Sequence, residues 1–201
     1  MELSISKVEE EFGKILSLRH ETLDPLVKHL SNGKDQMMSN ALPLEGAVYI
    51  FWWTGGVDQL KDNMINRSLN YKGPKGRDVE INYSKEWIDA INQDIGVPLY
   101  VGRLADNFNK RISLHLQLGA KRVLPLGEEA FLSNRKTTSN QLRDRVERMF
   151  IDEKDTRQLI LDNIGLSYVI LDGDEESVNR YFLVKKLIGG LFPLFNVDIE
   201  R

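Results

Sequence analysis

The chain has 201 residues, of which 41% are hydrophobic and 28% charged, and its formal net charge is -3. This length allows one well-buried core, alone or with a small subdomain, and the composition is that of an ordinary globular protein. The absence of cysteine excludes disulfides, thiolate zinc sites and cysteine nucleophiles. No run approaches the ~20 apolar residues that span a bilayer, and the N-terminus opens an acidic segment, so we expect a cytoplasmic protein.

Residues 4–30 have apolar side chains at helical spacing: Ile5, Val8, Phe12, Ile15 and Leu16, and then Leu26, Val27 and Leu30. The spacing predicts an N-terminal helical arm over residues 1–42. Pro43 then precedes a predicted strand, Gly46–Trp53, which from Val48 onward consists only of β-branched and aromatic residues.

Residues 54–97 form an insertion between this strand and the next. We predict helices over 57–65 and 84–92, with Ser84 as the N-cap of the second. The basic, glycine-rich segment 71–77 is open to two interpretations. It is either an ordinary surface loop or a clamp on a DNA backbone, formed by the cations Lys72, Lys75 and Arg77.

The second predicted strand, Pro98–Arg103, contains the sequence Leu99-Tyr100-Val101-Gly102. It is followed by a predicted helix that runs from residue 106 or 107 to about 117. Arg111 and His115 are four residues apart and therefore share one face of that helix. A third strand is predicted at 167–171, and a last helix from about 174 to 191.

Several short motifs resemble those of the GIY-YIG nuclease family: Gly46-Ala47-Val48-Tyr49, Tyr100-Val101-Gly102, Arg111 with His115, and Asn196 near the chain's end. The resemblance covers residues 46–196. It implies an α+β domain with a small mixed or antiparallel central sheet flanked by helices. It also implies Mg²⁺-dependent hydrolysis of phosphodiester bonds in double-stranded DNA.

In its size and insertions, the chain looks most similar to the type II restriction endonucleases of that family. This likeness implies sequence-specific cleavage, a homodimer that cuts both strands, and a companion DNA methyltransferase. A catalytically inactive DNA-binding protein on the same scaffold is the alternative function.

The resemblance also implies roles for five residues. Tyr49 would activate or orient the attacking water, and Arg111 would brace the scissile phosphate through its bidentate guanidinium. Tyr100 and His115 would position the nucleophile or transfer protons. Asn196 would hold the site together or form a hydrogen bond beside it.

One family position does not match. The family's metal-binding glutamate lies on the last helix, about three turns before the terminal asparagine, and Val184 occupies that position here. Valine cannot coordinate Mg²⁺, which requires oxygen ligands. Glu176 lies eight residues earlier, about 12 Å away along a helix, which is too far for a simple substitute. We expect residue 184 to face Arg111 and Tyr49.

Three explanations for Val184 remain open. They are a natural loss of activity, an inactivating substitution, and a metal ligand supplied from elsewhere.

Positive charge is concentrated in residues 101–150, which contain ten Lys/Arg and five Asp/Glu. A local basic surface is what a phosphate polyanion requires, although each residue can equally be a solvated surface charge. Ser139 is predicted to cap a helix whose N-terminus either binds phosphate and base edges or is simply exposed. The candidate DNA contacts in this region are Arg103, Lys121, Arg122, Arg135, Lys136, Thr137, Thr138, Asn140, Gln141 and Arg143.

Overall fold

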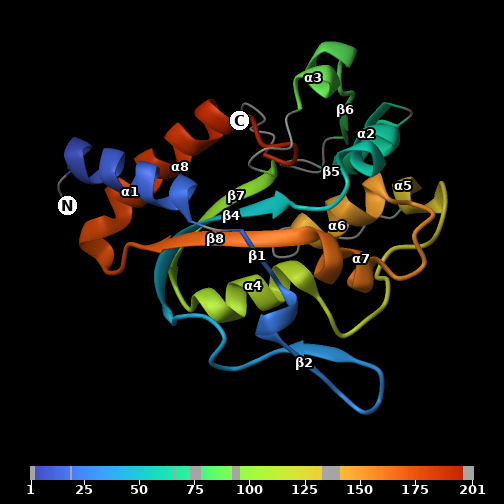
Figure 1. Cartoon of the computed structure of the whole chain (residues 1–201), viewed down its shortest axis with the longest axis horizontal. Coiled ribbons are helices and arrows are strands. Elements are labelled where there is room, and N and C mark those ends of the chain that lie inside the picture. Colours follow the sequence, from blue (N-terminus) through green and yellow to red (C-terminus); the bar gives the residue numbers. More distant parts are fainter. Residues whose placement is uncertain are drawn as a thin grey trace.

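A four-stranded antiparallel sheet forms the centre of the protein (Figure 1). In spatial order its strands are β1 (Glu21–Thr22), β8 (Ile164–Ile170), β4 (Glu45–Trp53) and β7 (Val97–Asp106). The computed structural model describes residues 3–18, 20–65, 67–72, 78–91, 96–132 and 141–196. The predicted α+β class is confirmed.

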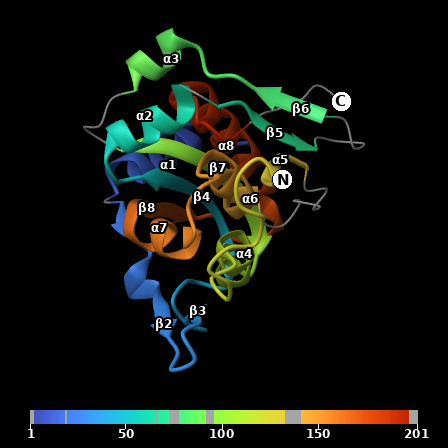
Figure 2. The same ribbon diagram turned by 90° about the vertical axis from the view of Figure 1, so that its right-hand side faces the viewer.

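Helices cover both faces of this sheet (Figures 1 and 2). One face packs against α1 (Ile5–Ser17) and α8 (Ser177–Leu191), and we call it the α8 face. The other, which we call the α4 face, packs against α4 (Phe108–Leu116), α6 (Gln141–Met149) and α7 (Thr156–Asn163).

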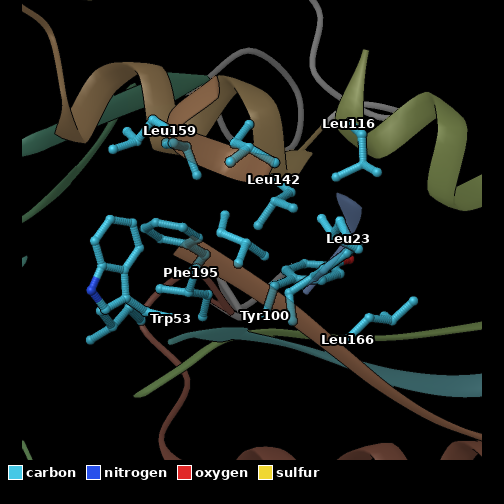
Figure 3. Packing of buried hydrophobic residues seen from close by; sticks show 14 of the residues in the cluster. Leu23, Trp53, Tyr100, Leu116, Leu142, Leu159, Leu166 and Phe195 are labelled. Atoms are coloured by element: carbon cyan, nitrogen blue, oxygen red, sulfur yellow. The ribbon is translucent and has the colours of Figure 1, made fainter. Parts of the chain in front are cut away.

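Strand β4 is buried on both faces, from Gly46 to its last residue. Because side chains alternate along a strand, Tyr49, Phe51 and Trp53 enter the larger core cluster on the α4 face. Val48 and Ile50 enter the smaller cluster on the α8 face. This double burial explains why the strand has a continuous apolar sequence. Figure 3 shows part of the larger cluster, where Tyr100 and Phe195 lie among leucines.

Two hairpins lie toward opposite ends of the molecule (Figure 2). One consists of β2 (Val27–His29) and β3 (Asp35–Met37), preceded by the 3-10 helix η1 (Asp24–Leu26). The other, in the 54–97 insertion, consists of β5 (Leu69–Lys72) and β6 (Asp78–Ile81) and is accompanied by α2 (Val57–Ile65) and α3 (Lys85–Ala90). Helix α5 (Glu129–Leu132) precedes α6, and η3 (Asp174–Glu176) precedes α8.

Most predicted elements from residue 43 onward are confirmed. The strands at 46–53, 98–103 and 167–171 correspond to β4, β7 and β8, and the helix at 57–65 is α2. Ser84 caps α3 by accepting a hydrogen bond from the backbone N–H of Trp87, at 3.2 Å. The predicted cap at Ser139 lies outside the described residues.

The predicted N-terminal helical arm is confirmed in its first part, as α1, and is wrong beyond it. Among the described residues of segment 1–42, Ile5–Ser17 alone is α-helical, and Val8 and Ile15 of that helix are buried against the α8 face. Farther along, Val27 pairs with Met37 across the β2–β3 hairpin, and both are buried. The apolar residues of this segment are spaced as in a helix, but in the structure Val27 and Met37 are buried on one face of a hairpin.

Candidate active site

Adjacent strands β4 and β7 bring two tyrosines together on the α4 face. The ring centroids of Tyr49 and Tyr100 are 6.3 Å apart. A register shift between Phe51 and Trp52 places an extra residue in β7, so that Leu99 and Tyr100 both enter the larger cluster. Tyr100 shares the face of Tyr49 because Gly102, two residues along β7, pairs with Tyr49 in the regular part of the register.

Gly102 gives the Tyr49 ring its space. Gly102 pairs with Tyr49 across the two strands, and a Cβ at residue 102 would lie 2.3 Å from both Cζ and the hydroxyl oxygen of Tyr49. No side chain fits there without moving the tyrosine. The glycine in the Tyr100-Val101-Gly102 motif thus has a steric purpose at the site.

Helix α4 contributes the next two groups. Its N-cap, Asn107, accepts a hydrogen bond from the Lys110 backbone N–H, and Arg111 and His115 follow at four-residue spacing. The Nε2 atom of His115 lies 2.9 Å from the Tyr49 hydroxyl oxygen. The guanidinium of Arg111 interacts with the phenols of both Tyr49 and Tyr100. Four predicted site residues from three elements therefore meet at one place.

Burial controls the protonation of this cluster. Desolvation raises the pKa of Tyr49 far above its ordinary value, and it also raises the pKa of Tyr100, against the opposing charges of Arg145 and Arg111. Burial, with Arg111 and Arg145 nearby, lowers the pKa of His115 to about 3. At neutral pH both phenols and the imidazole are uncharged, and the arginines carry the positive charge.

His115 also has a buried ring nitrogen that forms no hydrogen bond with the described residues. The side chain is fully buried, and its Nδ1 has no hydrogen-bond partner among the described residues. Within the described part of the chain, the imidazole therefore forms one hydrogen bond, to Tyr49.

Arg145 is a site residue that the sequence did not single out. It is 7% exposed, its Cζ lies 5.9 Å from the centroid of the Tyr100 ring, and its guanidinium donates a hydrogen bond to the Phe195 carbonyl. The sequence contains a signal for its position. Arg145 lies beside the apolar stripe of α6 formed by Leu142, Val146 and Met149, which is buried in the larger cluster.

Asn196 fastens the chain's last described segment to β7. Its side-chain amide donates to the Val101 carbonyl at 2.8 Å and accepts from the Val101 N–H at 2.6 Å. Leu194 and Phe195 donate backbone hydrogen bonds to Pro98 and Leu99. Of the two roles expected for Asn196, this geometry fits the one that holds the site together.

Val184 is not where we expected it. It lies on α8 and packs against the cluster on the α8 face, whereas Tyr49 faces α4. The expectation that residue 184 faces Arg111 and Tyr49 is therefore wrong, because the sheet separates them. A helix period fixes which residues share a face, but it does not fix which side of the sheet the helix covers.

The donor set around Tyr49 does not fit Mg²⁺. It consists of two phenols, an imidazole and two arginines, whereas Mg²⁺ requires an octahedron of oxygen ligands, usually with carboxylates. The described part of the chain contains no group of three or more His, Asp or Glu side chains placed to hold a metal ion.

Two residues predicted to contact DNA, Arg143 and Arg122, instead bind other parts of the protein. Arg143 is fully buried, with its Nε 2.6 Å from Glu147, and it donates to the carbonyls of Ala120 and Lys121. Arg122 donates to several backbone carbonyls, among them those of Glu147, Phe150 and Glu153. These arginines hold the loop after α4 against α6, so their charges are used inside the fold.

Arg103 and Lys121 are exposed. The Arg103 guanidinium lies 5.1 Å from the Tyr181 ring centroid, next to α8, and Lys121 lies 3.7 Å from the Asp155 carboxylate. The side chains of Lys72 and Gln141 are not described. The predicted contacts that lie wholly outside the described residues are Lys75, Arg77, Arg135, Lys136, Thr137, Thr138 and Asn140.

Comparison of the chain with models of known families, with curated proteins and with solved structures gave no match. The residues and their geometry are therefore the basis for any functional conclusion. None of the helices in the described ranges combines the length and apolar character needed to cross a bilayer.

Proposed function

We propose that this protein is a DNA endonuclease that hydrolyses phosphodiester bonds, as the resemblance to the GIY-YIG family implies. The observation that supports it best is the meeting of Tyr49, Tyr100, Arg111 and His115 on one face of the sheet. These residues are up to 66 positions apart in sequence, as the Tyr49–His115 hydrogen bond shows.

In this proposal the phosphate binds first to Arg111. Tyr49 and His115 are fully buried and Arg111 is half-buried, so Arg111 is the most accessible of the three. Its bidentate guanidinium matches two phosphoryl oxygens, and the charge that develops on them during attack strengthens that contact. Because Tyr49 is fully buried, attack also requires a movement of side chains at the site that lets water reach the Tyr49 hydroxyl.

The Tyr49–His115 hydrogen bond then serves as a proton relay. When water attacks phosphorus, the Tyr49 oxygen accepts a water proton while its own proton passes to Nε2 of His115, and the 3' oxygen departs and is protonated by solvent. A bound phosphate offsets the charges of Arg111 and Arg145. This weakens the part of the His115 pKa lowering that comes from the two arginines, while burial, its largest cause, continues to lower the pKa.

The finer parts of the proposal follow from the resemblance. They are sequence-specific cleavage by a homodimer with a companion DNA methyltransferase, and a requirement for Mg²⁺. Since the described donors do not fit this ion, the relay above uses only the chain's own residues, and the metal requirement is a separate question for experiment.

The test is digestion of a large phage DNA by the purified protein, with Mg²⁺ and, separately, with chelator. Discrete fragments are the expected result and would establish a sequence-specific nuclease. A protein that shifts duplex DNA in a gel but leaves it uncut under both conditions would overturn the nuclease proposal and favour the non-catalytic DNA-binding alternative.

A further inference from the structure

The β2–β3 hairpin lies at one end of the molecule (Figure 2) and has a polar and a buried face. Lys28 pairs with Gln36, and both side chains are exposed, whereas their neighbours Val27 and Met37 are 7% and 6% exposed. Side chains alternate along a strand, so Lys28 and Gln36 share the outward face of this two-stranded ribbon. Lys34, which immediately precedes β3, is also exposed.

The negative charge of the hairpin is compensated from within the fold. The carboxylate of Asp35 is buried, lying 3.1 Å from Arg157 Nε and 2.8 Å from His29 Nδ1. Arg157, from α7, also donates to the Gly33 carbonyl at 2.6 Å and so holds the hairpin turn. The ribbon is thus held in place by α7, and Lys28 and Lys34 face solvent. The exposed carboxylate of Asp24 lies 3.3 Å from His29 Nε2, on the segment just before β2, and is outnumbered by the two lysines.

Helix α4 connects the hairpin to the candidate active site. Asn109 donates to the carbonyls of Met38 and Ser39, at 3.1 and 3.3 Å, which seats the end of the hairpin on α4. A groove of about 250 Å³ separates Lys34 and Gln36 from Ser113 farther along the helix.

The same helix carries Arg111 on its other flank. At about 100° per residue, Asn109 and Ser113 point to the hairpin, Arg111 and His115 point to the tyrosines, and the exposed Lys110 lies between these two directions. A ligand that crosses the outer side of α4 can therefore contact the hairpin and Arg111 together.

We propose that the hairpin and the outer side of α4 form a contact surface for the phosphate backbone of duplex DNA, in which Lys28 and Lys34 bind phosphates away from the bond held by Arg111. This inference rests on the proposed function. Exposed cations on a firmly held ribbon suit a polyanion, and phosphate contacts of this kind set the register of a protein on the duplex.

The experiment measures binding of a labelled duplex by fluorescence anisotropy between 50 and 200 mM salt, for the parent and the double variant Lys28→Ala/Lys34→Ala. The loss of two phosphate contacts should reduce the log-log salt slope by about 1.8, which corresponds to about 60-fold weaker binding at 0.1 M salt when the affinity extrapolated to 1 M salt is unchanged. Two comparisons are matched to it. Lys14→Ala/Lys85→Ala removes the same charge from exposed positions on α1 and α3, and Lys28→Arg/Lys34→Arg keeps the charge in place.

The expected result is a reduced slope in the hairpin alanine variant alone, with an unchanged melting temperature and an unchanged cleavage rate at saturating DNA. If the parent binds but the hairpin variant keeps its salt slope, the hairpin inference is overturned and the nuclease proposal stands. Equal losses in both alanine variants would indicate a net-charge effect and would also overturn the inference. A parent that does not bind duplex DNA overturns the proposed function together with the inference.

Discussion

The two faces of the central sheet each place a histidine beside an aromatic residue of β4, and the surroundings of the two histidines differ. On the α8 face, His20 stacks on Trp52 at 4.0 Å, and its Nδ1 lies 2.8 Å from the Ser167 hydroxyl, which also accepts from Trp52 Nε1 at 3.1 Å. On the α4 face, His115 bonds to Tyr49 and keeps Nδ1 buried without a hydrogen-bond partner among the described residues.

The unpartnered Nδ1 is not peculiar to the α4 face, because Glu11 Oε2 on α1 also has no hydrogen-bond partner among the described residues. What distinguishes the α4 face is that the ring carrying this Nδ1 lies beside Tyr49 and Arg111, and a buried polar atom left without a hydrogen bond costs about 1–3 kcal/mol. Such a free-energy cost is tolerated at a site that must accept a proton or bind an anion during catalysis. The α4 face therefore carries the functional proposal, and the α8 face supplies its controls.

The largest expected effect comes from Arg111→Ala. Loss of one transition-state donor should slow cleavage by about 10²–10³-fold, or ~2.7–4 kcal/mol, while DNA binding weakens only modestly. Single-turnover cleavage at saturating DNA measures it. Lys186→Ala, which removes a cation from α8, should leave the rate unchanged, and an Arg111→Ala rate equal to that of the parent would remove Arg111 from the site.

Gly102→Ala should disturb the α4 face through packing. The new Cβ would lie 2.3 Å from the Tyr49 hydroxyl oxygen, so the ring must move and its bond to His115 is lost, at about 1–3 kcal/mol of overpacking. Denaturant unfolding and cleavage rates measure both effects. Gly189→Ala, on α8 with nothing within 4 Å, should be neutral or slightly stabilising. Equal behaviour of the two variants would contradict the steric role of Gly102.

Val184→Glu tests the separation of the two faces. The new carboxylate enters the apolar cluster on the α8 face, so we expect the free energy of unfolding to fall by about 1–3 kcal/mol, with no gain of Mg²⁺-dependent cleavage. Val184→Leu, which keeps the site apolar, is the matched control. Strong Mg²⁺-dependent cleavage by the glutamate variant alone would show that residue 184 belongs to the site after all.

The two titrating histidines should give pH effects of opposite sign. His115 has a pKa of about 3 in the folded protein and about 6.5 when unfolded, so between these values the unfolded chain binds more protons. The free energy of unfolding should therefore fall as pH drops below 6.5, by up to about 1.4 kcal/mol per unit from this group. His115→Gln should remove that part of the slope.

His29 is the control for this measurement. Its hydrogen bond to Asp35 raises its pKa in the folded protein, so its contribution is present at low pH and is lost as pH rises through that value. Denaturant titrations at several pH values measure both histidines. An unchanged acid slope in His115→Gln would show that His115 is not held neutral by burial.

The elements of the site could be predicted because each has a local signal. Hydrophobic spacing and residue propensity are enough to predict three features: the β-branched and aromatic run of β4, the strand with Tyr100-Val101-Gly102, and the helix on which Arg111 and His115 share a face. Their meeting in space was expected only from the family resemblance.

The rest depends on tertiary packing. The side of the sheet that α8 covers decides which residues Val184 contacts. The spacing of apolar residues along the helix does not specify that side. Helix α6 has a strongly polar sequence, yet Arg143 and Glu147 pair four residues apart in its buried interior. Composition predicts an exposed helix in such a case. The β2–β3 hairpin was missed because Val27 and Leu30 also fit a helical spacing.

The most direct test of the central claim, that the tyrosines on the α4 face carry out phosphodiester hydrolysis, is the single-turnover cleavage rate of three variants that each lose one hydroxyl group. Tyr49→Phe and Tyr100→Phe should lose most of the cleavage rate while keeping duplex binding, because the first removes the hydroxyl of the proton relay and the second removes a phenol that interacts with Arg111. Tyr49→Phe should also lower the free energy of unfolding by about 1–3 kcal/mol, because it leaves Nε2 of His115 without its hydrogen bond. Tyr181→Phe, on the exposed side of α8, should cut like the parent. Equal rates for all three variants, or a parent that binds duplex DNA and never cuts it, would contradict the account.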